Sequence, residues 1–394
     1  MINFLTKSLS IEIENFVNHL KKECGILYFK SFTKSAFVKY RRKINPNVFK
    51  QLSSILIDEF YTDNDAAIKL WNGLRVLAVD GSIITLPNTK ELRNKYGETI
   101  NQSSTSIVQA RVSVIYDVLN HYVLDGILSP LNVGESKLAL QHLQFCNKND
   151  LVIYDRGYPS YDLIYEHYIK GIDFLIRAKV GFNNITKTFI LSGKTSEIVD
   201  LYPGKNTNIT GKQYKKDTAI KVRLIRIELS GGETELLITS LLDADKYTYQ
   251  MFKKLYFKRW KIETFYDELK NKLKIEHFSG YSDQSILQDF NTVLFISNVQ
   301  TLIVSELEEE IEQISKTRKY QYKINTNLSY GFMKNKIVTL FLSDKGTEEI
   351  VAELKSLFKQ HLVPIRPERS NQRNSSKYRK RKKPKVTKNH KDAF

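Results

Sequence analysis

Residues 255–274 read LYFKRWKIETFYDELKNKLK, and the interpretation of the rest of the chain starts from this stretch. It contains no Gly or Pro and is rich in good helix formers, so we predict one continuous helix. At about 100° per residue, four polar side chains fall on one narrow stripe of that helix. These four are Tyr256, Arg259, Glu263 and Lys270. Such a stripe suggests a surface that handles phosphate, and a solvated charged face with i,i+4 pairing is the alternative.

The chain as a whole is strongly basic. Its 394 residues carry a formal net charge of +18, and the pI is about 9.5. This excess favours a polyanionic partner, with nucleic acid ahead of an anionic membrane surface. No apolar run reaches the roughly 18 residues of a spanning helix, and the N-terminus lacks the long apolar run of a signal peptide, so we expect no membrane association.

Cysteine usage points to a reducing compartment. The two cysteines, Cys24 and Cys146, form no CxxC pair, so neither a disulfide framework nor a zinc site is expected. We therefore expect a cytoplasmic protein in which any metal ion is held by oxygen ligands.

Between residues 73 and 180, strand patterns alternate with helix patterns. A buried-type strand ends in Asp80, a two-strand hairpin turns near Asn120-His121, and a second buried-type strand ends in Asp155. Helices and a fifth strand follow, and residues 86–106 read as a loop. The order is that of a ribonuclease-H-like domain, which is an α/β mixed sheet with strand order 3-2-1-4-5 and helices on its faces.

The segments on either side of this core have different compositions. Residues 181–245 predict mostly strands, with a bulge at Leu224-Ile225 and a hairpin turn at Gly231-Gly232. The chain is thus predicted to comprise a helical N-terminal domain (1–72), the first part of the catalytic domain (73–180), an inserted β subdomain (181–245), catalytic-domain helices (246–300), a C-terminal helical region (301–363) and a basic disordered tail (364–394). The N-terminal helices fit a DNA-docking module or an ordinary helical cap, and the tail fits DNA contact or a solubilising or targeting run.

Three carboxylates are the candidate catalytic groups. In the predicted sheet the first and fourth strands are parallel neighbours about 5 Å apart, which places Asp80 and Asp155 together at the carboxyl edge. Two negative charges at such a short distance favour a cation between them. With Glu263 they form an oxygen-only site suited to two Mg²⁺ or Mn²⁺ ions, which can activate an attacking hydroxyl and stabilise a leaving oxygen. The alternative for a strand-end Asp before Gly is a simple turn residue, and Asp117 and Asp125 are poorer candidates.

The basic groups around this site are candidate DNA contacts. Arg259 lies one helical turn before Glu263 and is predicted to clamp a phosphate oxygen. Lys270 lies about 10 Å further along the axis, within reach of a neighbouring phosphate. Tyr256 offers a hydroxyl to a phosphate or a ring to a base, and Arg156, directly after Asp155, is a further DNA-binding candidate.

Several of these segments resemble one known family. The spacing Y-x2-R-x3-E-x6-K in the stretch quoted first resembles the Y-R-E-K signature of DDE transposases from bacterial insertion sequences. Asp80 in VDGS and Asp155 in YDRGY are similar to the two aspartate motifs of that family. The segment from Glu135 to His142 is similar to the family's ERxLAxxHL stretch.

The resemblance implies a cut-and-paste transposase that uses two divalent cations. Such a protein would bind terminal inverted repeats of double-stranded DNA as a homodimer, free the ends and join them to target DNA. It would be nucleoid-associated when bound to DNA. In the family, the β insertion carries a tryptophan that stacks on a flipped base during a hairpin step, and the corresponding position here is Glu235.

Two other functions remain open from the residues. One is a metal-dependent nuclease that cuts DNA without joining it. The other is a non-enzymatic DNA-binding protein derived from a transposase, which is disfavoured because all three acidic positions and the whole Y-R-E-K set are intact.

Overall fold

A computed structural model of the chain describes residues 8–63, 66–100, 106–205, 207–228, 232–344 and 346–366. The chain divides into two compact units. The sheet unit comprises Asn64–Ile84 and Gln109–Asp267. The helical unit comprises Met1–Asp63, Thr85–Val108 and Glu268–Phe394. Each unit is built from segments that are distant in sequence, and the basic tail from residue 367 onward lies outside the described residues.

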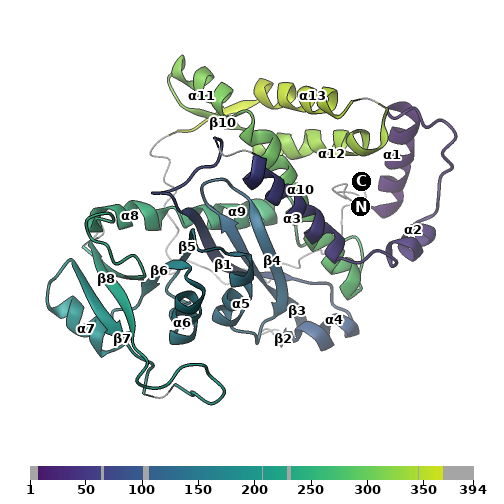
Figure 1. Cartoon of the computed structure of the whole chain (residues 1–394). Coiled ribbons are helices and arrows are strands. Elements are labelled where there is room, and N and C mark those ends of the chain that lie inside the picture. Colours follow the sequence, from purple (N-terminus) through teal and green to yellow (C-terminus); the bar gives the residue numbers. More distant parts are fainter. Residues whose placement is uncertain are drawn as a thin grey trace, which may run out of the picture. The chain divides into compact units, whose positions relative to one another are not determined.

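The sheet unit is built on a mixed β-sheet (Figure 1). Its strands are β1 (Arg75–Thr85), β3 (Ser106–Asp117), β4 (Val123–Pro130), β5 (Asp150–Tyr154), β6 (Asp173–Ala178), β7 (Ser196–Leu201), β8 (Ile220–Glu228) and β9 (Thr234–Thr239). They lie in the order β4-β3-β1-β5-β6-β9-β8-β7, and β1, β5 and β6 run parallel. The first five positions reproduce the predicted order 3-2-1-4-5, so the ribonuclease-H-like arrangement is confirmed.

Helices cover both faces of this sheet. They are α5 (Glu135–His142), α6 (Tyr161–Lys170), α7 (Asn184–Leu191), α8 (Tyr249–Phe257) and α9 (Trp260–Asn271), with a 3₁₀ turn at Leu143–Phe145. Residues of α5, α6 and α7 share one apolar core with the central strands, and Figure 1 shows α5 and α6 beside β1 and β5. On the other face, the ring of Phe265 stacks on Tyr116 with 4.9 Å between centroids. Burial on both faces explains why the central strands are almost uniformly apolar.

The predicted insertion extends the sheet. Strand β9 pairs antiparallel with β6, and β8 and β7 follow in sequence outward. The predicted bulge at Leu224-Ile225 is wrong, because β8 keeps an unbroken register with both neighbours across these residues. Both side chains are buried because the strand is covered on both faces, which produces the apparent break in alternation. Of the predicted hairpin turn, Gly231 lies outside the described residues.

The helical unit combines helices from the N-terminal and C-terminal parts of the described chain. Its helices are α1 (Leu9–Lys22), α2 (Lys34–Arg41), α3 (Asn47–Asp63), α4 (Lys90–Tyr96), α10 (Asp283–Ser305), α11 (Glu308–Lys316), α12 (Thr326–Leu342) and α13 (Thr347–Gln360). Short strands complete it: β2 (Glu98–Ile100), β10 (Tyr322–Ile324) and β11 (Leu362–Pro364). The N-terminal helices pack on the C-terminal ones, as shown by the ion pair of Glu12 with Lys334 at 2.8 Å.

Two further features qualify the sequence interpretation. Residues 86–106 are not wholly a loop, because α4 and β2 form there, and Thr89 caps α4 by accepting a hydrogen bond from the Leu92 N–H. Among the described residues no single helix is long and apolar enough to cross a membrane, whereas α10 and α11 taken together, with a 52° bend, would pass that test by length and composition.

Candidate active site at the carboxyl edge of the sheet

The sheet brings the two predicted aspartates to neighbouring strands. Strand β1 pairs with β5 in parallel up to the Ala78–Ile153 register, and Asp80 and Asp155 follow within two residues. Strand β1 itself continues to Thr85, so Asp80 lies at the end of the β1–β5 pairing and not at the end of its strand. Each carboxylate accepts a backbone N–H from a following glycine, Gly81 to Asp80 at 2.8 Å and Gly157 to Asp155 at 2.6 Å.

The predicted continuous helix is broken in the structure. Helix α8 ends at Phe257 and α9 begins at Trp260, with Lys258 and Arg259 in the turn between them. The break places Arg259 between two of the carboxylates. Its Nη1 lies 3.5 Å from Asp80 Oδ2, and its Nη2 donates to Glu263 Oε1 at 2.6 Å. Arg259 therefore links the helix-borne carboxylate to the strand-borne one.

Electrostatics mark Asp80 as a carboxyl group with a perturbed pKa. Burial raises the pKa of Asp80 to about 6, against the opposing effects of the Gly81 N–H and the Arg259 guanidinium. The neighbouring negative charges of Asp155 and Glu263 raise it further. A carboxyl group with a raised pKa beside two other carboxylates is typical of a site that binds a positive charge.

Two of the predicted DNA contacts are buried in this structure. Tyr256 is 4% exposed, and within the described residues its hydroxyl has no hydrogen-bond partner. Burial also raises the pKa of Tyr256 above its ordinary value. The Arg259 side chain is 6% exposed and is already engaged by carboxylates. Both side chains point into the protein in this structure, and their roles as phosphate contacts stay predictions.

The other two predicted DNA contacts are more accessible. Arg156 is exposed in the turn after β5. Lys270 is half-buried in the last turn of α9. Both predictions remain untested by the geometry. Asp117, ranked as a poor catalytic candidate, accepts the backbone N–H groups of Leu119 and Asn120 and so shapes the hairpin turn.

The donor set fits a hard divalent cation in chemistry. Asp80, Asp155 and Glu263 offer only oxygen ligands, which Mg²⁺ and Mn²⁺ prefer. Among the described residues, no three or more His, Cys, Asp or Glu side chains are gathered closely enough to enclose a metal ion. In this structure the positive charge between Asp80 and Glu263 is the Arg259 guanidinium.

Sequence reasoning missed two residues of this edge. Tyr266 on α9 donates its hydroxyl to the Asp80 carbonyl at 2.7 Å, which anchors the helix to the strand. Nothing in the sequence separates this tyrosine from an ordinary core aromatic. Glu135 at the start of α5 lies against Gly81 and Gly157 and pairs with Arg111. Its place in the ERxLAxxHL-like segment was the available signal.

Glu235, the position at which the family pattern has a tryptophan, has a local ion-pair partner. It lies on β9 and pairs with Arg177 of the adjacent strand β6 at 2.8 Å. A carboxylate held in this way offers no surface on which a base can stack.

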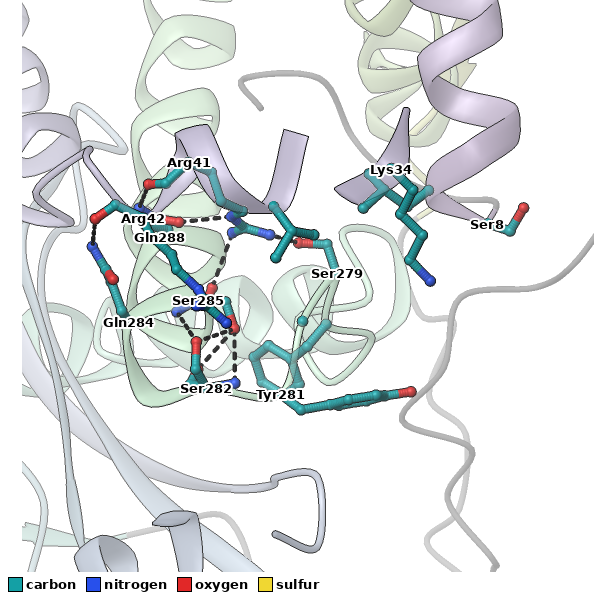
Figure 2. Close-up of a pocket in the computed structure, with 14 residues that line it drawn as sticks. Ser8, Lys34, Arg41, Arg42, Ser279, Tyr281, Ser282, Gln284, Ser285 and Gln288 are labelled. Atoms are coloured by element: carbon teal, nitrogen blue, oxygen red, sulfur yellow. Dashed lines mark hydrogen bonds between the residues drawn. The ribbon is translucent and has the colours of Figure 1, made fainter. Parts of the chain in front are cut away.

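A cavity of about 460 Å³ lies in the helical unit, between α2 and the start of α10. Lys34, Arg41, Arg42 and Tyr281 are among its lining residues. Figure 2 shows that the guanidinium of Arg41 is held by Gln288 and Ser279. Arg41, the most buried of the cationic residues named at this cavity, is thus used for internal hydrogen bonds. The sheet edge is therefore the better candidate active site.

Comparison with known proteins places most of the sheet unit in one family. Residues 71–299 match the protein family described as "Transposase DDE domain". The "Transposase InsG for insertion sequence element IS4" of Escherichia coli (strain K12) is 23% identical over 317 residues, or 76% of this chain and 67% of that protein. The "Putative transposase InsZ" of the same organism is 26% identical over 153 residues, or 38% of this chain and 48% of that protein.

One solved structure is similar at lower sequence identity. It is the piggyBac transposase synaptic complex with hairpin DNA, aligned over 95% of this chain and 87% of that one, with 9% identity and a TM-score of 0.42. This TM-score is too low to equate the two folds.

Proposed function

Because the chain belongs to the family of DDE transposases, we propose that it is the cut-and-paste transposase of an insertion sequence. It would cleave DNA at terminal inverted repeats and join the freed ends to target DNA. The observation that carries this proposal is the convergence of Asp80 and Asp155 on adjacent parallel strands, with Glu263 tied to Asp80 through Arg259.

The three carboxylates are the proposed ligands of two divalent cations, Mg²⁺ or Mn²⁺. When bound, such ions polarise the phosphodiester, lower the pKa of the attacking hydroxyl and stabilise the leaving oxygen. The chain's own residues position the ligands. The N–H groups of Gly81 and Gly157 orient the two aspartates, and the Arg259 guanidinium orients Glu263 toward Asp80.

Double-stranded DNA is the proposed partner, bound by a homodimer. The exposed guanidinium of Arg156 and the ammonium of Lys270 are proposed backbone contacts, since phosphates dominate protein–DNA affinity. For Tyr256 and Arg259, DNA contact requires a rearrangement that exposes them. The N-terminal helices and the basic tail are proposed to add electrostatic affinity for the DNA ends.

Cleavage and joining with end DNA test the proposal. The DNA that flanks the coding region supplies the inverted repeats for the substrate. Wild-type protein with Mg²⁺ is expected to cleave these ends and to join pre-cleaved ends to a target plasmid. Glu263→Gln is expected to retain binding to the ends and to lose both reactions.

Two outcomes would overturn the proposal in different ways. Cleavage without joining of pre-cleaved ends would make the protein a nuclease. Wild-type cleavage rates in Glu263→Gln would remove Glu263 from the active site.

A further inference from the structure

The Glu135 carboxylate lies between the two turns that carry the aspartates. Its Oε1 is 3.2 Å from where a Cβ on Gly81 would stand, and its Oε2 is 3.3 Å from the same position on Gly157. A Cβ on Gly157 would also lie 3.0 Å from Asp155 Oδ1. Neither glycine has a positive φ. Close approach of carboxylates, and not backbone conformation, therefore accounts for a glycine at both positions.

An arginine holds this carboxylate in place. Arg111 on β3 donates from Nη1 to Glu135 Oε1. The Arg111 and Glu135 side chains are 18% and 35% exposed, so the pair is only partly hydrated. A charge-assisted bond in such surroundings restricts the rotamers of both side chains.

Strand β3 holds the other end of helix α5 as well. His142 Nε2 lies 3.0 Å from Ser113 Oγ, and His142 Nδ1 lies 3.0 Å from Asp125 Oδ2. Arg111 and Ser113 are two residues apart and share a face of the strand. Glu135 and His142 are seven residues apart and share a face of the helix. Both ends of α5 are thus fixed to one strand, which aims Glu135 at the glycine turns.

A second contact joins α5 to the turn after Asp155. The Ser136 hydroxyl donates to the Tyr158 carbonyl at 3.3 Å. Tyr158 itself is 1% exposed, and its hydroxyl has no hydrogen-bond partner among the described residues. The first turn of α5 therefore contacts the turn after Asp155 at two points, through a carboxylate and through a hydroxyl.

We propose that Glu135 is a positioning residue of the cation site. Its carboxylate, held by Arg111, sets the spacing between the turns of Asp80 and Asp155 and thereby the affinity with which these two aspartates take up a divalent cation. Glu135 acts through the aspartates, because both of its oxygens lie against glycine backbones and one is engaged by Arg111. The inference rests on the proposed function only in taking Asp80 and Asp155 as cation ligands.

Mn²⁺ binding to the full-length protein without DNA tests this role directly. Titration calorimetry of Glu135→Gln is expected to show Mn²⁺ affinity at least tenfold weaker than in the wild type. The substitution keeps the size of the side chain but removes the charge that fixes Arg111. Cleavage by Glu135→Gln is expected to need a correspondingly higher Mn²⁺ concentration, with binding to end DNA unchanged.

Asp162→Asn is the matched control. Asp162 on α6 is also 35% exposed and also pairs with a cation, Lys212 at 3.0 Å. It is expected to bind Mn²⁺ as the wild type does. If Glu135→Gln does not fold, as judged by thermal melting, Glu135→Asp replaces it, since it keeps the charge with a shorter reach and should give an intermediate affinity.

Each result has a distinct meaning. Wild-type Mn²⁺ affinity in Glu135→Gln, or in Glu135→Asp where that variant replaces it, would overturn the positioning role. Wild-type affinity in Asp80→Asn would instead overturn the cation site of the proposed function. Loss of affinity in both Asp80→Asn and Glu135→Gln, with Asp162→Asn unaffected, would support both proposals.

Discussion

Arg41 and Arg259 are both almost fully buried, at 4% and 5% exposure, yet their surroundings differ. Arg41 in the helical unit uses its whole guanidinium. Its Nε donates to Gln288 at 2.8 Å and its Nη1 to Ser279 at 2.6 Å (Figure 2). Its Nη2 lies 3.2 Å from Asp289 Oδ1. Arg259 in the sheet unit faces two carboxylates, and its buried Nε has no hydrogen-bond partner among the described residues.

This difference in hydrogen bonding distinguishes an arginine that stabilises the fold from one that can take part in a reaction. A fully satisfied buried arginine stabilises a fold, since removing it would leave its partners without hydrogen bonds. An incompletely satisfied buried arginine beside a carboxylate of perturbed pKa, as Arg259 is beside Asp80, is the arrangement found at functional sites.

Arg259→Met is expected to lower end cleavage about a thousandfold, equivalent to about 4 kcal/mol in the activation barrier. The reason is that Glu263 loses the contact that orients it toward Asp80. Single-turnover cleavage rates with Mg²⁺ measure the effect, and a thermal melt checks the fold. A variant that cleaves at the wild-type rate would remove Arg259 from the site. An unchanged salt dependence of DNA binding would argue against a phosphate contact.

Arg41→Met is expected to destabilise the protein by about 3 kcal/mol, because it leaves the buried polar partners of Arg41, and the Asp289 carboxylate, without their hydrogen bonds to this arginine. Urea unfolding measures this loss. Cleavage per folded molecule should stay near the wild-type value. The adjacent, exposed Arg42 provides the control, and Arg42→Met should unfold at nearly the wild-type urea concentration. Equal stability of the two variants would show that burial of Arg41 contributes nothing.

Asp80→Asn is expected to stabilise the folded protein by about 3 kcal/mol at pH 7 to 8. Folding raises the pKa of Asp80 from 3.8 to about 6, so the folded state binds more protons than the unfolded state between these values. Stability contributed by this group therefore falls as pH rises through that window. Unfolding at pH 4 and pH 8 should show the advantage of the variant only at the higher pH, and an equal advantage at both would contradict the assigned pKa.

Tyr256→Phe is expected to change stability by less than about 1 kcal/mol, because the buried hydroxyl that it removes has no partner within the described residues. Affinity for end DNA, measured by fluorescence anisotropy, should also remain near the wild-type value. Markedly weaker binding would support the prediction that this hydroxyl contacts a phosphate.

The strand-borne half of the site was predictable from the sequence, and the helix-borne half only partly. Two apolar runs that each end near an aspartate, in the order of a ribonuclease-H-like sheet, were enough to place Asp80 beside Asp155. The break at Lys258-Arg259 was not predictable, because no Gly or Pro marks it. It accompanies the contact of Arg259 with Asp80, which is 179 positions away in sequence and known only from the fold.

Glu135 illustrates a second limit. Its acidic position at a helix start is an ordinary favourable feature. Its proximity to Gly81 and Gly157 depends on how α5 is fixed to β3, and no local pattern encodes that register. Likewise, Leu224-Ile225 suggested a bulge because two adjacent apolar residues break strand alternation. The sequence does not show that β8 is covered on both faces.

Anomalous diffraction from crystals of the protein soaked in Mn²⁺ would show whether divalent cations bind at this sheet edge. We expect a Mn²⁺ peak coordinated by the carboxylates of both Asp80 and Asp155, and its loss in Asp155→Asn crystals. Mn²⁺ bound only elsewhere in the molecule, or a peak at these residues that persists unchanged in Asp155→Asn, would contradict the assignment of this sheet edge as the active site.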